Sequence, residues 1–240
     1  MVDQAVLVIP ARWASTRFPG KLLVPVAGKP LIQWVWEAAM RCRQVREVIV
    51  ATDERRILEA ARAFGARVEF TRSDHRSGTD RMAEVAERIH SGVYVNVQGD
   101  EPAVDPAEID RLIAEMGSAP VATLRRKLAP EEAENPNVTK VVCDRQGYAL
   151  YFSRAAVPFV RDTGRDVPRW AHVGVYAFRA EALRHFAGSP PGELEQAESL
   201  EQLRVLENGI PMIALPTAMR CFGVDVPEDV ERVEQVLIQR

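Results

Sequence analysis

Residues 8–21 read VIPARWASTRFPGK, and this stretch decides the fold. An apolar strand is predicted over residues 5–9, and it stops at the proline that follows. The next loop carries Arg12, Arg17 and Lys21 together with two hydroxyl groups and a Pro-Gly turn. Guanidinium groups, a lysine ammonium and backbone amides are groups that bind phosphate oxygens. The pattern therefore predicts a polyphosphate loop directly after the first strand.

Two other phosphate-binding patterns are excluded by the sequence. The chain contains neither G-x-x-x-x-G-K-[ST] nor G-x-G-x-x-G. Any two of the basic residues taken alone would be typical of an ordinary basic loop. The ordered set R-x-x-S-x-R-x-P-G-K over residues 12–21 is much more specific, and it favours a dedicated phosphate site.

Short apolar runs alternate with helical patterns from this loop to residue 97. We expect strands at 5–9, 48–51, 68–71 and 93–97, with helices at 31–43, 54–64 and 79–89 between them. This order is typical of a mostly parallel sheet with helices on both faces, whose ligands bind outside the carboxyl ends of the strands. Three polar motifs follow strands there: the first loop, the loop at Thr71 and the turn at Asp100.

The second half of the chain has a different pattern. Short β-rich stretches at 121–124, 140–143, 149–152 and 172–178 predict antiparallel strands that are inserted into the main sheet or extend it. Helices are expected at 180–186 and 193–207, a strand at 212–215, and a last helix with Pro227 at its first position. We expect one domain over residues 1–240, with a β-rich subregion at about 121–190.

Composition limits the classes of function. The 240 residues are 47% hydrophobic and 27% charged, which is typical of a soluble globular protein. A net charge of −3 gives no broad field for nucleic acid or anionic lipid. No apolar run approaches the roughly 20 residues of a membrane span. Cys42, Cys143 and Cys221 are scattered, which predicts neither disulfides nor zinc. We expect a cytoplasmic protein with no nucleic-acid or membrane partner.

Six motifs, in order along nearly the whole chain, resemble those of the 3-deoxy-manno-octulosonate (KDO) cytidylyltransferases, also called CMP-KDO synthetases. They are RWASTRFPGK at 12–21, TRSDHRSGTDR at 71–81, NVQGDEP at 96–102, YALYFSR at 148–154, LEQLR at 200–204 and GVDVPED at 223–229. The resemblance implies a mostly parallel, Rossmann-like α/β nucleotidyltransferase sheet flanked by helices. It also implies transfer of CMP from CTP to the 2-hydroxyl of KDO with release of pyrophosphate, for lipopolysaccharide biosynthesis. The β-rich insertion would join a homodimer.

Two aspartates at strand ends are candidate metal ligands. Asp100 and Asp225 could share a hard divalent cation with phosphate oxygens, as Mg²⁺ prefers. From the residues alone, a turn-forming role for Asp100 and a capping role for Asp225 are as well supported. The family resemblance implies the metal role for both aspartates, with Mg²⁺ as the cofactor.

The resemblance also implies roles for further residues. Catalysis would rest on Arg12, Lys21, Asp100 and Asp225. The nucleotide would contact Ala11, Arg12, Ser15, Lys21, Arg72, Ser77, Gly78 and Thr79. The sugar acid would contact Arg17, Gln98, Ser153, Arg154, His172, Tyr176, Glu201 and Gln202. Arg17 could instead face the phosphates, and His172 is the candidate for a general base.

Structural roles stay open for several of these residues. Tyr176 could belong to the core, His172 could be a satisfied strand histidine, and Glu201 and Gln202 could lie on an exposed helix face. One position departs from the family pattern: Ala171 stands where an arginine precedes the histidine of H-x-G-x-Y. The alternatives are therefore a cytidylyltransferase for 8-amino-KDO or a sialic acid, and a non-catalytic regulator that binds nucleotide sugars.

Overall fold

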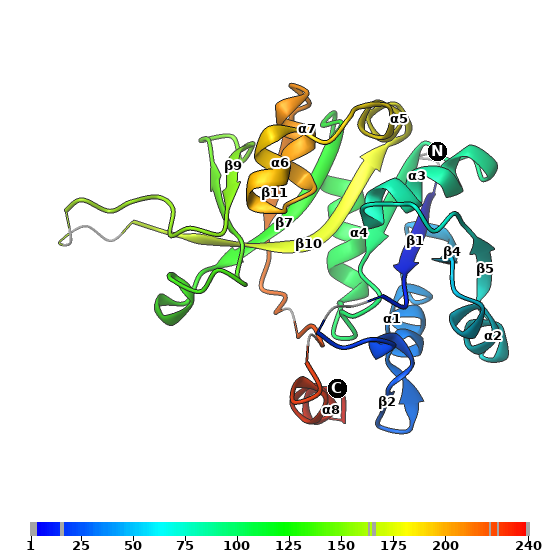
Figure 1. Cartoon of the computed structure of the whole chain (residues 1–240). Coiled ribbons are helices and arrows are strands. Elements are labelled where there is room, and N and C mark those ends of the chain that lie inside the picture. Colours follow the sequence, from blue (N-terminus) through cyan, green and yellow to red (C-terminus); the bar gives the residue numbers. More distant parts are fainter. Residues whose placement is uncertain are drawn as a thin grey trace.

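The structure is a computed structural model that describes residues 4–14, 17–162, 164, 167–220, 222–224 and 226–238. Within these residues, nine strands form one mixed sheet with helices on both faces (Figure 1). The strands are β1 Ala5–Ala11, β4 Val45–Thr52, β5 Arg67–Phe70, β6 Val93–Val97, β7 Val121–Lys127, β8 Lys140–Cys143, β9 Ala149–Ser153, β10 Trp170–Arg179 and β11 Met212–Pro216. A small hairpin joins β2 Pro25–Val26 to β3 Lys29–Pro30.

The first half of the chain builds the parallel part of the sheet. The order across the sheet is β5-β4-β1-β6, with every neighbour parallel. Because β4 and β5 lie on one side of β1 while β6 lies on the other, the strand order reverses between β1 and β6. Open α/β sheets bind their ligands at such a point, at the carboxyl ends of the strands. This part of the fold confirms the predicted mostly parallel α/β sheet.

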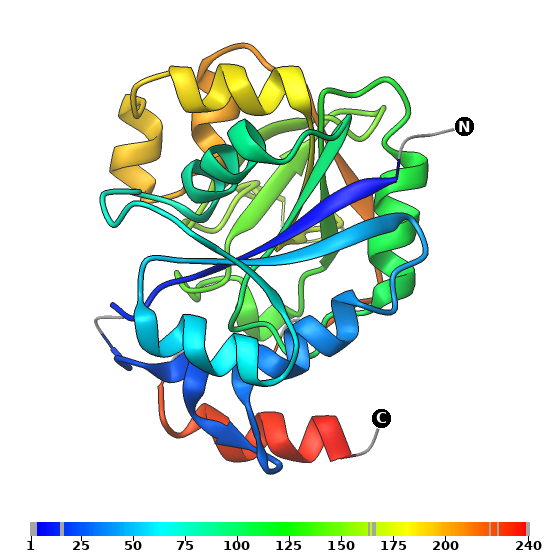
Figure 2. The same ribbon diagram turned by 90° about the vertical axis from the view of Figure 1, so that its right-hand side faces the viewer.

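Helices cover the two faces of this sheet. They are α1 Leu31–Ala39, α2 Arg55–Ala63, α3 Gly78–Arg88, α4 Pro106–Glu115, α5 Ala180–Gly188, α6 Glu193–Glu198, α7 Gln202–Glu207 and α8 Asp229–Ile238. Buried side chains of α1, α2 and α4 form one core cluster, and those of α3, α5 and α7 form a second one on the opposite face. Figure 2 shows α1 and α2 on one side of β1 and β4, with α3 and α5 on the other. Alternate residues of β1 supply the two clusters, and all seven are buried.

The second half of the chain adds the predicted antiparallel strands. β10 runs antiparallel to β6, β7 and β8, and β9 runs antiparallel to β8. β11 pairs parallel with β7 at the edge of the sheet. The segment between β9 and β10, described over residues 154–162, 164 and 167–169, projects away from the rest of the molecule (Figure 1). We call this segment the arm.

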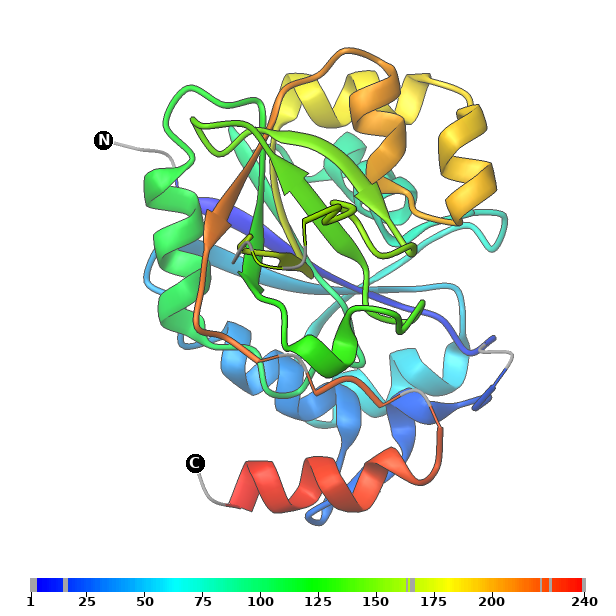
Figure 3. The ribbon, with the colours of Figure 1, turned by 90° about the vertical axis from the view of Figure 1, so that its left-hand side faces the viewer.

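The C-terminal helix lies apart from the sheet. α8 lies beside the β2–β3 hairpin (Figure 3). Val233 and Leu237 of α8 share a small apolar cluster with Val26 of the hairpin and Leu31 of α1. The Ala27 N–H donates to Glu234 Oε1 at 2.8 Å. In the described part of the chain, each helix is too short or too polar to cross a bilayer.

The helix predicted at 193–207 is wrong as a single element. α6 ends at Glu198, and Ser199 adopts a left-handed φ of 52°. In one straight helix, residues nine apart would lie about 13 Å apart along the axis. Here Arg204 Nε donates to Glu195 Oε2 at 2.7 Å, because α7 folds back onto α6. A buried ion pair therefore replaces helical continuity.

Two further elements differ from the prediction. α8 begins at Asp229, two residues after Pro227, and the Asp229 carboxylate accepts a hydrogen bond from Val226 N–H at 3.1 Å. α4 was not predicted, although Asp105 caps it and Pro106 occupies its first turn, which is a recognised start signal.

Candidate functional site

The reversal point of the sheet brings two loops into contact. β1 ends at Ala11, and β6 ends immediately before Gln98, Gly99 and Asp100. A Cβ atom on Gly99 would lie 3.2 Å from the carbonyl oxygen of Pro10, so the glycine permits this close approach. The predicted phosphate loop and the Asp100 turn therefore form neighbouring walls of one site.

An ion pair links these walls. Lys21 Nζ lies 2.5 Å from Asp100 Oδ2, and the two side chains are 11% and 28% exposed. Lys21 is the first residue of a short 3₁₀ helix, Lys21–Leu23, which follows Gly20 at a left-handed φ of 75°. Arg12 and Arg17 are exposed on the same loop. The site thus presents several cations beside one partly exposed carboxylate.

An aromatic contact closes the base of the phosphate loop. The Gly20 N–H donates to the Trp13 carbonyl at 3.1 Å, and a Cβ on Gly20 would lie 2.7 Å from the Trp13 ring. The guanidinium of Arg56 lies 3.5 Å from the centroid of that ring, and Glu54 holds Arg56 by an ion pair of 2.8 Å. The start and the end of the loop are therefore held together, with α2 stacked on them.

The start of α3 forms the next wall. Ser77 caps the helix, and its hydroxyl and backbone both bond reciprocally with Asp80. A Cβ on Gly78 would lie 3.2 Å from Gln98 Nε2, so the glycine lets the helix start pack against the end of β6. The Thr79 hydroxyl accepts a hydrogen bond of 3.2 Å from the buried amide of Asn96. The segment with Ser77, Gly78 and Thr79 therefore lies beside the phosphate loop.

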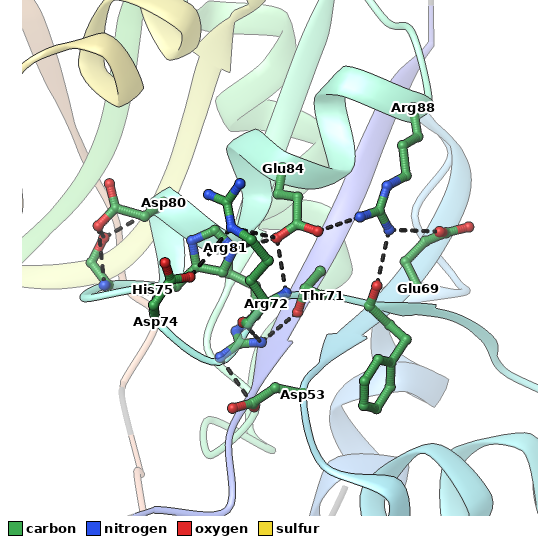
Figure 4. A network of polar contacts seen from close by, with 12 residues as sticks. Asp53, Glu69, Thr71, Arg72, Asp74, His75, Asp80, Arg81, Glu84 and Arg88 are labelled. Atoms are coloured by element: carbon green, nitrogen blue, oxygen red, sulfur yellow. Dashed lines mark hydrogen bonds and ion pairs between the residues drawn. The ribbon is translucent and has the colours of Figure 1, made fainter.

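A buried carboxylate on α3 orders the loop before this helix (Figure 4). Glu84 is 5% exposed, and its Oε2 accepts a hydrogen bond of 3.0 Å from Arg72 N–H. The same carboxylate contacts His75 Nε2 and the guanidinium of Arg88. Burial alone would raise the pKa of Glu84, but these hydrogen bonds and charges hold the pKa below its usual value. Glu84 therefore anchors both Arg72 and His75.

Arg81 fixes the other side of this loop (Figure 4). Its side chain is 4% exposed, lies 3.1 Å from Asp53 at the end of β4, and donates to the Thr71 hydroxyl and the Arg72 carbonyl. Burial lowers the pKa of Arg81, and the nearby charge of Arg12 acts in the same direction. Arg81 is therefore a structural clamp that faces the phosphate loop.

A second buried charge network connects α3 with α7. Arg204 is 2% exposed and donates to Asp80 Oδ1 at 2.8 Å and to both carboxylate oxygens of Glu195. Its guanidinium also lies 4.2 Å from the ring centroid of Phe186. Burial opposes the charge, but Glu195 and Asp80 raise the pKa of Arg204 above its usual value. Since Asp80 also bonds to Ser77, this network positions the start of α3.

Several predicted sugar-acid residues lie on the same side of the sheet. Glu201 Oε2 accepts a hydrogen bond of 3.2 Å from Thr79 N–H, and burial raises the pKa of Glu201. Gln202 and Tyr176 are buried, at 4% and 4% exposure. Gln98 is half-buried beside Asn96. Glu201 therefore belongs to the wall formed by α3, while Gln202 and Tyr176 lie largely within the protein.

His172 is held by neighbours on the sheet. Its Nε2 lies 2.9 Å from Thr123 Oγ1, and that hydroxyl also lies 2.8 Å from the carbonyl of Val175. Because the hydroxyl donates its one hydrogen to the carbonyl, it accepts the Nε2–H of His172. The ring packs against Phe152 and Tyr176, and burial lowers the pKa of His172 to about 3. The imidazole is therefore neutral at physiological pH.

Ser153 and Arg154 are tied to the loop after α6. Glu198 accepts hydrogen bonds of 2.6 Å from the Ser153 hydroxyl and 2.9 Å from the Arg154 backbone. The guanidinium of Arg154 donates to the carbonyls of Glu198, Pro136 and Ser199, at 2.7, 2.9 and 3.3 Å. Both side chains therefore join the β9 strand to neighbouring loops.

Ala171 does not face these residues. It is fully buried, and it precedes His172 in β10, so the two side chains point to opposite faces of the sheet. The departure from the family pattern at this position therefore does not change the surface that His172 lines.

The structure brings most predicted site residues around the end of β6. Ser15 and Asp225 lie outside the described residues. Val224 N–H donates to the Asp100 carbonyl at 3.2 Å, which brings the segment 222–224 beside the Asp100 turn. Sequence reasoning missed Glu84, His75 and Glu198. The spacing of Asp80, Glu84 and Arg88, four residues apart on the predicted helix at 79–89, was the available signal for the first.

Comparisons with known proteins agree with this arrangement. A family model described as Cytidylyltransferase matches residues 6–215. The chain is 50% identical to a 3-deoxy-manno-octulosonate cytidylyltransferase of Geobacter sulfurreducens, over 96% of this chain and 98% of that protein. It is 47% identical to a protein of the same name from Solibacter usitatus, over 95% of this chain and 92% of that protein.

Solved structures show the same likeness. The structure of CMP:2-keto-3-deoxy-manno-octonic acid synthetase complexed with CTP matches with a TM-score of 0.93 and 42% identity, over 98% of this chain and 99% of that chain. A cytidylyltransferase from Leptospira borgpetersenii matches with a TM-score of 0.67 and 16% identity, over 99% and 87% of the two chains. At that lower identity the likeness shows the fold alone.

The Glu84 anchor predicts local order. Glu84→Gln keeps the shape of the side chain but removes the charge that holds Arg72 N–H and His75. We expect amide hydrogen exchange in the loop between Arg72 and Ser77 to accelerate at least about tenfold, since charge-assisted hydrogen bonds contribute about 1.5–3 kcal/mol each. Exchange measured by mass spectrometry tests this, with Glu87→Gln, exposed on the same helix, as the control. Equal exchange in the two variants would contradict the anchoring role.

Burial of His172 predicts an acid dependence of stability. The pKa is about 3 in the folded protein and about 6.5 in the unfolded chain, so the unfolded chain binds more protons as the pH falls between these values. Between pH 6.5 and 4.5, wild type should lose about 2 kcal/mol more of its free energy of unfolding than His172→Gln does. Urea unfolding at both pH values measures this difference, and parallel losses in the two proteins would disprove the burial of a neutral imidazole.

Proposed function

The chain belongs to the cytidylyltransferases, and within them to the 3-deoxy-manno-octulosonate cytidylyltransferases; from this membership we propose that it transfers CMP from CTP to KDO. The 2-hydroxyl oxygen of KDO forms a bond to the α-phosphorus of CTP. The bond from that phosphorus to the bridging oxygen breaks, pyrophosphate leaves, and the hydroxyl proton is released. The product is CMP-KDO, for lipopolysaccharide biosynthesis.

The observation that carries this proposal is the placement of cations at the reversal point of the sheet. Lys21 lies beside Asp100, and Arg12 and Arg17 are exposed on the same loop. Positioning and neutralisation of charge supply most of the catalysis in phosphoryl transfer. Arg12 and Lys21 would hold the triphosphate and stabilise the leaving pyrophosphate.

The start of α3 would border the rest of the nucleotide. Arg72, Ser77, Gly78 and Thr79 lie on one ordered segment, which Glu84 and Asp80 hold in place. The backbone N–H groups at the first turn of a helix favour anions and polar groups. We assign this segment, with Ala11 and Ser15, to the nucleotide.

Mg²⁺ is the proposed cofactor. Asp100 fits it, because its hard carboxylate oxygens are partly exposed and already attract a cation, the Lys21 ammonium. No group of three potential metal ligands occurs within the described residues, so phosphate oxygens would complete a site built on Asp100 and Asp225. When bound, Mg²⁺ would neutralise phosphate charge and lower the pKa of the attacking hydroxyl.

The sugar acid would lie between the Asp100 turn and the segment that carries Glu201. Gln98 and Glu201 offer hydrogen bonds to hydroxyl groups, and Arg17 offers a charge for the carboxylate. His172 is a neutral donor or acceptor with a pKa of about 3, so it is too weak a base to be assigned the hydroxyl proton. Ser153, Arg154, Tyr176 and Gln202 would shape the wall, since their polar groups are bonded or buried within the protein.

We also propose that the arm joins two copies of the chain. Phe159 is 86% exposed, the highest value among the large apolar side chains of the described residues, and Leu150 on the neighbouring strand β9 is 61% exposed. Large exposed apolar side chains on one projecting segment favour an interface between protein molecules. A homodimer that uses the β-rich region would cover them.

Pyrophosphate release tests the catalytic proposal. CTP with KDO should give the highest turnover when CTP, ATP, GTP and UTP are each combined with KDO, 8-amino-KDO and a sialic acid at constant Mg²⁺. Asp100→Asn should lower kcat at least about 100-fold, because charge stabilisation in the transition state is lost. Glu115→Gln, which removes an exposed carboxylate from α4, is the control. Full turnover in Asp100→Asn would exclude the metal role, and preference for another acid would change the substrate.

Sedimentation tests the dimer. Phe159→Glu places a charge in the proposed interface and should convert a dimer into a monomer at micromolar concentration. Phe70→Glu is the matched control, since Phe70 is 47% exposed on β5, at the opposite edge of the sheet. A monomeric wild type, or a Phe159→Glu variant that stays dimeric, would show that the arm does not form the interface.

A further inference from the structure

The contact between Lys21 and Asp100 joins a rigid carboxylate to a flexible cation. Asp100 follows β6 directly, and its carbonyl is bonded to Val224 N–H. The Lys21 backbone is equally fixed, because its carbonyl accepts Val24 N–H at 3.1 Å and Leu23 N–H bonds to Gly20. Only the four-carbon stem of Lys21 can move freely. A change of side-chain rotamer is therefore enough to remove the ammonium from the carboxylate.

The ammonium occupies a position that suits a metal ion. Lys21 Nζ lies 2.5 Å from Asp100 Oδ2, and the lysine side chain is only 11% exposed. A carboxylate neutralised at this distance attracts a second cation weakly, because a divalent ion bound beside it would be repelled by the ammonium. A triphosphate carries several negative charges, and it would draw the ammonium away from the carboxylate.

We propose that the Lys21 ammonium is a placeholder cation on Asp100, which suppresses metal binding to the protein until nucleotide arrives. This inference rests on the proposed function, since it assigns the same carboxylate to Mg²⁺. It gives Lys21 two successive partners, Asp100 in the free protein and phosphate oxygens in the complex. Metal binding would then follow nucleotide binding, and the metal would meet the phosphates in its first encounter with the site.

The test is a titration of the intact protein with Mn²⁺ in the absence of nucleotide, in which free Mn²⁺ is measured by electron paramagnetic resonance. Lys21→Met keeps the length of the stem and removes the charge. We expect this variant to bind Mn²⁺ at least about fivefold more tightly than wild type, because the repulsion of the ammonium is lost. Circular dichroism verifies folding, and Lys21→Gln is a second variant with the same expected result.

Two further proteins make the result specific. Lys29→Met changes the net charge equally but removes a different ion pair, between Lys29 and Glu37 at 2.8 Å, so its Mn²⁺ affinity should equal that of wild type. In Lys21→Met combined with Asp100→Asn, the gain should disappear. Equal affinity of Lys21→Met and wild type, or a gain that survives Asp100→Asn, would overturn the proposal.

The titration contains neither CTP nor KDO, so its outcome is separate from that of the proposed function. A gain in Mn²⁺ affinity that depends on Asp100 would support the placeholder role even if another nucleotide or sugar acid proved to be the substrate. A catalytically active enzyme with no gain would retain the proposed function and lose the placeholder role.

Discussion

Parallel pairing of β1 with β6 is the constraint on which the site depends. Val6, Leu7 and Val8 pair with Tyr94, Val95 and Asn96, so both strands end at the same edge of the sheet. This register places a cationic loop and an acidic turn side by side, although they are far apart in the sequence. Opposite charges at this edge attract each other in the free protein, and they separate only when a ligand offers better partners.

The helix α3 transmits this constraint to the rest of the site. Its first turn packs against the ends of β1 and β6, and its charged residues reach three other elements. Asp80 bonds to Arg204, Arg81 to Asp53, and Glu84 to Arg72 and His75. Removing one partner from a buried ion pair typically costs about 3–5 kcal/mol, because the other charge stays buried without compensation. Such networks contribute order at a fixed geometry, which suits a segment that must meet a nucleotide in one position.

The sugar-acid side is built differently from the phosphate side. Cations on the phosphate side are exposed or paired with a carboxylate that can release them. On the other side, Arg154 is bonded to backbone carbonyls and His172 is neutral, so these groups shape the wall and carry little adjustable charge. Recognition of the sugar acid would therefore depend on hydroxyl groups and shape more than on charge. The fully buried Ala171 lies behind this wall and leaves its surface unchanged.

The sequence alone determined the alternating elements of the first half, the cap of α3 at Ser77 and the family, because apolar periodicity, local capping and ordered motifs are properties of neighbouring residues. The break at Ser199, the neutral state of His172 and the binding of Arg154 to carbonyls were decided only by the tertiary structure. Each depends on groups distant in the sequence: Arg204 meets Glu195 across a turn, Thr123 meets His172 across two strands, and Glu198 meets Arg154 between a strand and a helix. A local pattern does not specify such partners, because burial and charge pairing are set by the whole packed chain.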